Sequence, residues 1–200
     1  MRWVRLIAVI VLLVLQPASV AAFYISTFAG GGSSLVDGVA ATTASFTNPF
    51  QTWIDTSETF LYVADYNNCR IRQVSLVANT ITTFAGNGIS CASAGDGLAA
   101  TAATLYYPYG IGGDSVGRIF ISEDSHRVRV VNASSSGSNS RIIQTYAGSG
   151  IGGSGGDGGL AAAATAQLNY PRYVAVDTGG NLLIADYYNH KIRKVQYYFY

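Results

Sequence analysis

The stretch that decides the fold of this chain is Asn181-Leu182-Leu183-Ile184-Ala185-Asp186, then Tyr-Tyr-Asn-His at residues 187–190, then Lys191-Ile192-Arg193-Lys194-Val195. Its first part is mostly apolar, and cationic and aliphatic residues alternate in its last part. Alternation with a period of two is typical of a strand that buries one face and exposes the other to water. Asp186 and Asn189 favour a turn between the two parts. We therefore predict strands at Leu182–Ala185 and Lys191–Val195, with the basic side chains of the second in solvent.

The same pattern occurs twice earlier in the chain. One copy spans residues 60–65 and 70–74, and the other spans residues 118–123 and 127–131. A proline precedes each of the three copies, and the prolines are 59 residues (49 to 108) and 63 residues (108 to 171) apart. Three similar segments in fixed order at a fixed period indicate a repeat architecture, such as an array or a propeller.

The repeat also includes the segments between these copies. A Thr-Phe-Ala-Gly or Thr-Tyr-Ala-Gly motif is followed each time by glycines, an Asp-Gly pair and an Ala/Thr-rich stretch. The motif begins at Thr27, Thr83 and Thr145, and the Asp-Gly pairs begin at Asp37, Asp96 and Asp157. We interpret the aspartates of these pairs as turn formers. The glycine runs lack the lysine of a phosphate-binding loop, so we interpret them as connections between units.

Each unit has four expected strands, except that the third unit has three. The first strand follows the proline, as at residues 173–177, and the fourth lies at Thr80–Phe84 in the first unit and Ile142–Tyr146 in the second. Four strands joined by tight turns are one propeller blade. We predict an all-β fold with three blades of four antiparallel strands, in units of about 49–84, 108–146 and 171–197.

These motifs resemble the NHL repeat, and the resemblance covers most of the chain after residue 22. The third unit matches the family pattern most fully, at Asn189-His190-Lys191-Ile192. The first unit departs from it at Cys69, where the family has histidine, and the second departs at Glu123, where the family has aspartate. The resemblance implies a β-propeller, commonly with six blades. It does not specify a function, because NHL propellers serve many tasks.

A segment before the first unit, Tyr24–Phe28, matches the fourth strand that the third unit lacks. We predict that it is an orphan outer strand. Three blades are too few for a ring, since propellers have about four to eight. Two alternatives follow: a head-to-tail homodimer, in which each orphan strand completes the third blade of the other copy, or a piece of a longer protein with further blades.

The N-terminal residues have the pattern of a secretory signal peptide. Arg2 and Arg5 precede an apolar run from Leu6 to Leu15, and small residues follow at Val20-Ala21-Ala22. The run is shorter than the roughly 20 residues that cross a bilayer. We predict a signal peptide at residues 1–22, a propeller domain at 23–200, secretion, and no membrane contact after cleavage. An uncleaved anchor is the alternative.

Composition limits the partners of this chain. Without Arg2 and Arg5, ten Lys and Arg residues remain of the twelve, against eleven Asp and Glu residues, so the net charge is −1. No basic run is present that could neutralise phosphates, which argues against nucleic acid as a partner. In an oxidising compartment Cys69 and Cys91 either pair in a disulfide or remain two thiols. Asn132-Ala133-Ser134 is a sequon for N-glycosylation.

The candidate site residues fall at repeated positions. Equivalent carboxylates occur at Asp65, Glu123 and Asp186, and His126 and His190 precede the third strands of their units. Carboxylates or histidines from several blades could ligate a metal, and the resemblance includes amidating lyases that hold a metal in the propeller channel. Recurrence in every unit favours a structural role in turns. We predict no catalytic residue, no cofactor and no metal.

Tyrosine is the unusual residue type of this chain. Six tyrosines in turns and near the prolines form the predicted interaction surface: Tyr66, Tyr107, Tyr109, Tyr173, Tyr187 and Tyr188. Tyrosine is enriched at interfaces, although these rings could instead pack between blades. The leading hypothesis is an extracellular module that binds a protein or a glycan. The alternative is part of a six-bladed enzyme, similar to lactonases or amidating lyases, whose metal ligands lie mostly outside this chain.

Overall fold

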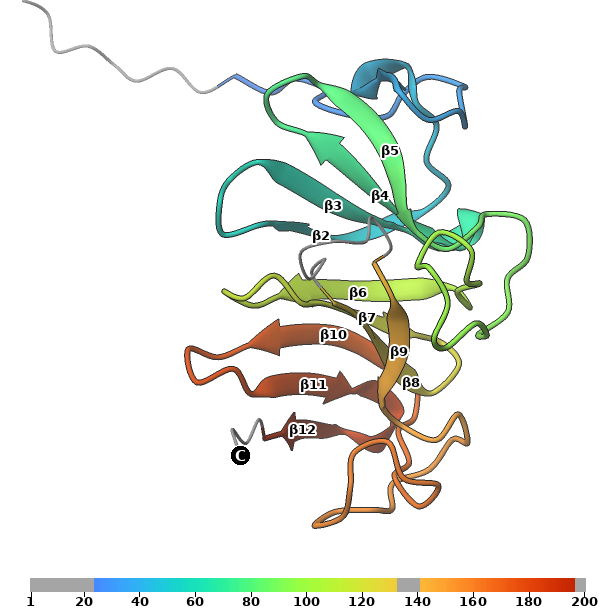
Figure 1. Cartoon of the computed structure of the whole chain (residues 1–200), viewed down its shortest axis with the longest axis vertical. Coiled ribbons are helices and arrows are strands. Elements are labelled where there is room, and N and C mark those ends of the chain that lie inside the picture. The colour runs from blue at the N-terminus through green and yellow to red at the C-terminus, as the bar shows by residue number, and fades with distance from the viewer. Residues whose placement is uncertain (1–23, 133–140, 197–200) are drawn as a thin grey trace, which may run out of the picture.

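The structure is a computed structural model, and it describes residues 24–132 and 141–196. Three antiparallel sheets follow one another along its long axis (Figure 1). The prediction of an all-β fold is confirmed, because the only helical segments among the described residues are three short 3-10 turns. The predicted signal peptide at residues 1–22 lies outside the described residues.

Each sheet contains the strands of one predicted unit, and the first sheet also has a short fifth strand before its unit, which was not predicted. The first has the order β1-β5-β4-β3-β2, with strands Val39–Ala40 (β1), Pro49–Ile54 (β2), Phe60–Asp65 (β3), Arg70–Ser75 (β4) and Thr80–Ala85 (β5). The second has the order β6-β7-β8-β9, with strands Pro108–Gly113, Ile119–Glu123, Arg127–Val131 and Ile143–Ala147. The third has the order β10-β11-β12, with strands Pro171–Val176, Leu182–Asp186 and Lys191–Val195. The 3-10 turns are Ala41–Thr43 (η1), Tyr66–Asn68 (η2) and Tyr187–Asn189 (η3).

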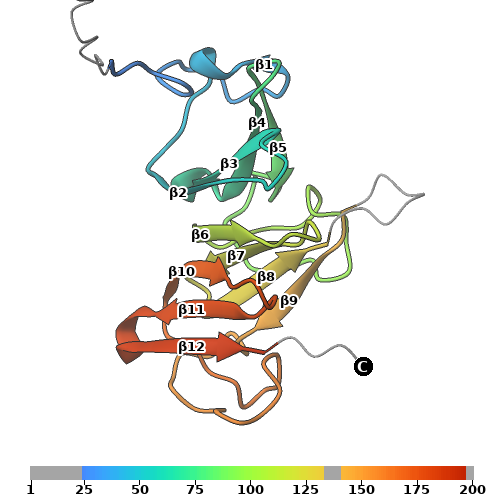
Figure 2. The ribbon, with the colours of Figure 1, turned by 90° about the vertical axis from the view of Figure 1, so that its left-hand side faces the viewer.

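The first strands of the units lie side by side. β6 lies between β2 and β10 and contacts both (Figure 2). In every unit the proline that begins the first strand pairs with the carboxylate residue that ends the second. Antiparallel pairing therefore places the start of each first strand beside the turn that follows each second strand, at the same edge of every sheet.

Two apolar cores hold the three sheets together. The first core joins Tyr62, Ala64 and Ile71 of the first sheet to Ile121 and other residues of the second. The second core joins the second sheet to the third through residues including Phe120, Val128, Val174, Leu182 and Ile184. Alternation along β3 and β7 gives each sheet two apolar faces, so that a middle sheet packs on both neighbours.

Glycines let the middle sheet approach its neighbours closely. A Cβ atom at Gly110 would lie 2.2 Å from the carbonyl oxygen of Arg172 on β10. A Cβ at Gly113 would lie 2.5 Å from the ring of Trp53. The buried hydroxyl of Ser122 accepts the Gly110 N–H at 2.9 Å and donates to the Arg172 carbonyl at 2.9 Å, which links the second sheet to the third. Gly110 is therefore required by the close approach of the β10 backbone, and Gly113 leaves room for the Trp53 ring.

The predicted orphan strand Tyr24–Phe28 pairs with no other described residue and Ile25 is fully exposed, so its role as an outer strand stays a prediction. One expectation from the sequence is wrong. The basic face of the third strand is not in solvent in the first two units, since Arg72 and Arg129 are 0% and 1% exposed. The connection that precedes each unit folds over that face and brings a carboxylate to it.

Candidate functional site

The three equivalent carboxylates are buried and occupied by the fold. Asp65, Glu123 and Asp186 are all 0% exposed. Each accepts a backbone N–H from the residues just before the first strand of its own unit, namely from Thr47 at 2.8 Å, Tyr106 at 3.2 Å and Asn169 at 2.6 Å. Each also accepts a side-chain hydrogen bond from the following turn, from Asn68, Ser125 and Asn189. These carboxylate oxygens therefore link the segment before the first strand of each unit to the turn that follows its second strand.

A second set of carboxylates, in the Asp-Gly pairs, forms a repeated ion pair that was not predicted from the sequence. Each aspartate contacts the second basic residue of the third strand, in the pairs Asp37 with Arg72, Asp96 with Arg129, and Asp157 with Arg193. The aspartates are half-exposed or more, whereas the first two arginines are buried. The signal was available, because both residues of each pair recur at fixed places in the repeat. These pairs secure the connecting segments to the sheets.

Glu123 is the carboxylate that departs from the family pattern, and its surroundings differ from those of Asp65. Burial raises the pKa of Glu123, while Arg129 and hydrogen bonds from Ser93 and Ser125 oppose that rise. The Arg129 guanidinium lies 3.8 Å from the Glu123 carboxylate. The longer side chain thereby reaches Ser93, in the connection between the first and second units.

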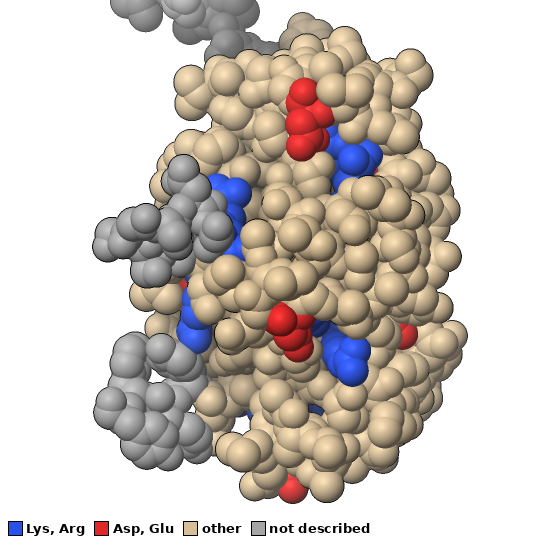
Figure 3. All heavy atoms as spheres, turned by 45° about the vertical axis from the view of Figure 1, so that its right-hand side comes forward, with Lys and Arg blue, Asp and Glu red and all other residues tan. Residues whose placement is uncertain are grey.

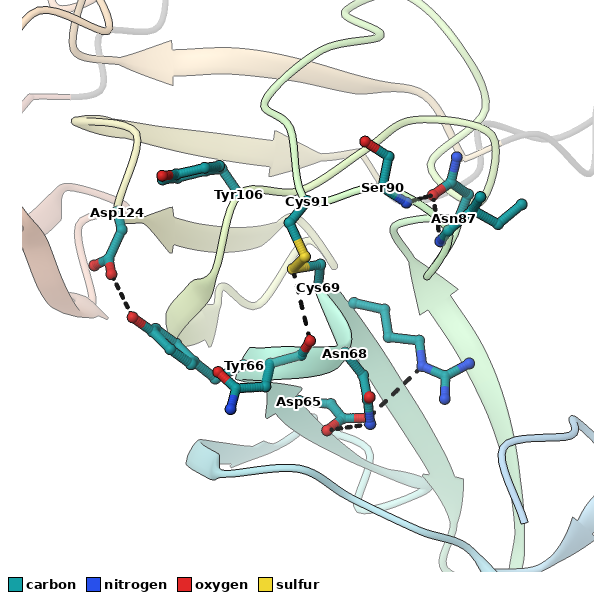
Figure 4. Close-up of a disulfide and its surroundings, with 12 residues drawn as sticks. Asp65, Tyr66, Asn68, Cys69, Asn87, Ser90, Cys91, Tyr106 and Asp124 are labelled. Carbon is teal, nitrogen blue, oxygen red and sulfur yellow. Dashed lines mark hydrogen bonds and ion pairs between the residues drawn. A yellow bond between two sulfur atoms is a disulfide. The ribbon is translucent and has the colours of Figure 1, made fainter. Parts of the chain in front are cut away.

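One backbone position recurs in all three units, and in the first two it ties the unit to the segment that follows it. Cys69, His126 and His190 all adopt the left-handed conformation, with φ of 51°, 63° and 54°. This conformation closes the turn before the third strand, and His is among the residues that tolerate it. Cys69 forms a disulfide with Cys91 in the next connecting segment, with the Cα atoms 5.3 Å apart (Figure 4).

His126 makes the corresponding tie without a covalent bond. Its Nδ1 accepts the N–H of Tyr170 at 3.2 Å, and its ring meets the Tyr170 ring edge to face at 4.6 Å. Burial lowers the pKa of His126, although Asp124 and Asp186 oppose this. Since the imidazole must accept a hydrogen bond at Nδ1, it is the neutral form that makes this contact. His190, at the same position of the third unit, is exposed.

The predicted tyrosine surface gathers at the edge where the first strands begin. We define the aromatic mouth as the cluster of Phe50, Tyr66, Tyr107, Tyr109, Arg172, Tyr173 and Tyr187. Tyr109 is its centre and is only 8% exposed, so this ring packs between the units, which was the alternative left open for these tyrosines. Tyr173 and Tyr187 form an exposed rim at 51% and 52%. Tyr188 lies outside the mouth, against Tyr170 and Tyr187.

Ring contacts make the mouth continuous across the three units. Tyr109 stacks on Phe50 with ring centroids 3.9 Å apart, and it meets Tyr66 and Tyr173 edge to face at 5.8 Å each. Tyr66 also contacts Tyr107 at 5.1 Å. Edge-to-face and offset stacked pairs are the favourable aromatic geometries. The mouth is therefore a continuous cluster of packed rings.

Polar groups inside the mouth are fixed as well. The Arg172 guanidinium lies over the Tyr109 ring at 4.5 Å and the Tyr187 ring at 4.3 Å, and it donates to the Tyr109 hydroxyl at 2.7 Å. The Tyr66 hydroxyl donates to Asp124 at 2.6 Å. Burial, together with this hydrogen bond and the Asp124 charge, raises the pKa of Tyr66, so that the phenol stays protonated as a donor. Sequence reasoning missed Phe50, Arg172 and Asp124, although Phe50 and Tyr109 both follow the proline of their units.

Residues suited to metal binding are not brought together in the described part of the chain. Residues 24–132 and 141–196 contain no group of three or more His, Cys, Asp or Glu side chains able to hold an ion. On the face drawn in Figure 3, charged groups are sparse, acidic and basic atoms lie beside each other, and no broad patch of one sign is visible. Asn132 of the sequon is exposed. No helix in the described ranges has the length and apolar character needed to span a membrane.

Comparisons with known proteins agree with this architecture. Residues 168–195 match the family model of the NHL repeat. No curated protein matches the chain. Among solved structures, it is similar to a protein of unknown function from Bacteroides thetaiotaomicron (TM-score 0.63, 20% identity, covering 76% of this chain and 36% of that one). It is also similar to auxiliary nutrient binding proteins from B. thetaiotaomicron (TM-score 0.57, 17% identity) and Bacteroides ovatus (TM-score 0.56, 23% identity), each covering 72% of this chain and 36% of the other.

The sheets, the repeat and these matches define the class of this protein. It is an all-β protein built from propeller-type blades. Its third unit is an NHL repeat, which confirms the resemblance predicted from the sequence. The chain spans about a third of the length of the solved structures that it resembles, and their low identity shows the fold alone.

Proposed function

We propose that this protein is a secreted interaction module of the NHL propeller type, and that the aromatic mouth is its binding surface. One observation carries the proposal: Tyr109, Tyr173 and Arg172 form a packed cluster with a buried centre and an exposed rim. Tyrosine and arginine are the residues enriched where binding energy concentrates in protein interfaces, near a well-packed centre. Secretion rests on the predicted signal peptide.

The shape of the mouth favours a protein ligand over a glycan. Small ligands bind mostly in concave sites of about 300 to 1,000 Å³. Two cavities in the described part of the chain, of about 350 and 360 Å³, are lined by other residues and include none of the mouth. A surface of edge-to-face rings with fixed hydroxyl and guanidinium groups suits a protein partner, which can supply a complementary pocket or an extended segment.

The test is a parallel screen of the secreted chain against an array of extracellular proteins and an array of glycans. Each array is probed with the wild type, with a Tyr173→Ala/Tyr187→Ala variant and with a control, Val116→Ala, which changes an exposed residue outside the mouth. We expect protein signals that the double variant loses and the control keeps. Glycan signals with the same dependence would assign the mouth to carbohydrate. Signals unaffected by the double variant would refute the mouth as the binding surface.

The two rim tyrosines are suitable test positions because they contribute little to the fold. Both are about half exposed, so truncation removes contact area mainly from the surface. A partner that covers the mouth would bury both rim tyrosines in the interface, where truncation of a hot-spot tyrosine costs about 2 kcal/mol or more and weakens binding at least about thirtyfold. Arg172→Lys keeps the charge but loses the planar group that lies over the two rings, so it should also weaken binding.

A further inference from the structure

The short turn between β7 and β8 contacts both sides of the aromatic mouth. On one side, Asp124 accepts the Tyr66 hydroxyl at 2.6 Å (Figure 4), and its N–H donates to the Tyr107 carbonyl at 3.4 Å. On the other side, His126 accepts the N–H of Tyr170, which directly precedes β10. This turn of the second unit therefore links the first-unit part of the mouth to the start of the third unit.

Tyr170 lies where a change of the backbone would move part of the mouth. After one proline it is followed by Arg172 and Tyr173, which belong to the mouth. Its φ is 52°, in the left-handed region that bulky residues rarely adopt unless their surroundings hold them there. The residues before the other two prolines have the same conformation, Asn48 at 54° and Tyr107 at 46°. Asparagine tolerates it, whereas both tyrosines are contacted by the turn between β7 and β8.

The contact between His126 and Tyr170 depends on the protonation state of the imidazole. Nδ1 of His126 accepts the Tyr170 N–H at 3.2 Å, and only the neutral ring has a nitrogen that can accept. The protonated ring carries a hydrogen on both nitrogens, so it would turn an N–H toward the N–H of Tyr170. The same imidazole packs edge to face on the titratable ring of Tyr170, so a ring that turns away loses both contacts.

The surroundings of His126 offer the protonated ring another partner. Burial lowers the pKa of His126, and the charges of Asp124 and Asp186 oppose this. Oδ1 of Asp124 is buried and has no hydrogen-bond partner in the described part of the chain, so it can accept an N–H from the imidazolium. The neighbouring Arg127 donates to backbone carbonyls, and the connection packed against the ring, residues 148–156, contains no charged residue. The two states of the ring therefore have different partners on opposite sides.

We infer that His126 is a pH-dependent switch of the aromatic mouth, which holds Tyr170 when neutral and releases it when protonated. In the protonated state the ring pairs with Asp124, the strained backbone before β10 relaxes, and Arg172 and Tyr173 leave the cluster. The release occurs as the pH falls below about 6.5, the usual pKa of histidine. This conformational change needs no ligand, whereas its consequence for binding rests on the proposed function.

The first test follows the secreted chain without a ligand, by NMR of the ¹⁵N-labelled protein from about pH 7.5 to about pH 5.5. This range spans the usual pKa of histidine and lies above those of Asp and Glu. We expect the Tyr170 amide to lose protection from hydrogen exchange as the pH falls. The amide signals of Arg172 and Tyr173 should shift with the same midpoint as the His126 ring. A His126 ring that titrates without a shift at Arg172 and Tyr173 overturns the proposal.

The chain offers a matched control, because it contains two histidines at equivalent positions. His126→Asn removes the titrating ring and keeps a residue that tolerates the left-handed backbone. His190→Asn makes the same change at φ of 54° in the third unit, where the side chain is exposed. The transition should disappear in the first variant and persist in the second, and the reverse result overturns the proposal. If His126→Asn does not fold, His190→Asn decides alone, since His126 is then the one histidine left.

The second test measures affinity for a protein from the extracellular array whose signal requires Tyr173 and Tyr187. Because one proton is linked to the change, the Kd should rise by up to about tenfold per pH unit below the pKa of His126 in the folded chain. His190→Asn should keep this dependence and His126→Asn should lose it. An affinity that does not change with pH overturns the link between His126 and binding. If no signal on the array requires the two tyrosines, the proposed function is wrong, and the NMR transition decides the switch by itself.

Discussion

The disulfide between Cys69 and Cys91 should supply a measurable part of the stability of this chain. It closes a loop with a sequence separation of 22 residues. In the chain-entropy model, cross-linking a loop of that length restricts the unfolded state by about 3 kcal/mol at 25 °C. The free energy of unfolding of a domain is about 5 to 15 kcal/mol, so the loss of this bond is a large fraction of the total.

The substitution must respect the backbone at position 69. Cys69 has φ of 51°, and alanine there would add strain to the loss of the bond. Asparagine adopts the left-handed conformation more readily. The variant is therefore Cys69→Asn/Cys91→Ser, compared with the wild type in oxidised form. The wild type unfolded in the presence of reductant is the matched control, because it loses the bond without a change of sequence.

The assay is guanidinium unfolding followed by tryptophan fluorescence. Trp53 is the one tryptophan after residue 22, and it packs against Tyr62 and Gly113 between the first two sheets. A loss of about 3 kcal/mol shifts the midpoint by about 0.5 to 1.5 M for the usual range of guanidinium slopes. Midpoints that agree among the oxidised wild type, the reduced wild type and the variant would refute the assigned role of the disulfide.

Three further predictions concern contacts between and within the units. Gly110→Ala should destabilise the chain by about 1 to 3 kcal/mol, because the added Cβ would collide with the backbone of β10. The control Gly159→Ala, whose Cβ would have its nearest atom at 3.4 Å, should cost little, and equal unfolding midpoints of the two variants in guanidinium would contradict this. Arg129→Met should lower the free energy of unfolding by about 3 to 5 kcal/mol, because it leaves Glu123 buried without its cation. Adding Glu123→Gln should recover much of that loss, and a double variant no more stable than the single one would show that the pair is not coupled. Because folding lowers the pKa of His126, the stability that its neutral ring contributes is present above about pH 6.5 and is lost as the pH falls through the pKa of the folded state. Unfolding midpoints in guanidinium should therefore fall with acidification more in the wild type than in His126→Asn.

Most of the strands could be predicted closely because the repeat presents each of them several times, although β1 was missed. Residues 182–185 were expected as a strand, and β11 spans Leu182–Asp186. The fourth strands were expected at 80–84 and 142–146 and were found at Thr80–Ala85 and Ile143–Ala147. Agreement among three copies removes the ambiguity that one short apolar run would have.

What covers each face of a strand could not be predicted from alternation. The pattern of β4 and β8 separates basic from aliphatic side chains correctly, but a connecting segment distant in sequence decides that Arg72 and Arg129 are buried. The strand predicted at 24–28 stays a prediction for a related reason, since a strand needs a neighbour and no described residue pairs with this segment. The tyrosines were found by composition, whereas Asp124 and Arg172 were missed because the other units have no equivalent of them.

The places where the units differ are the best guide to function in this chain. Shared features, such as the buried carboxylates and the Asp–Arg pairs, serve the fold and recur because every blade needs them. At the tie position the backbone is constant and the side chain varies with the neighbour, from the Cys69 disulfide to the His126 hydrogen bond. In the mouth, Asp124 and Arg172 interrupt the repeat and organise the tyrosines around them. Since one fold serves many functions, departures from the repeat carry more information about this protein than the repeat itself.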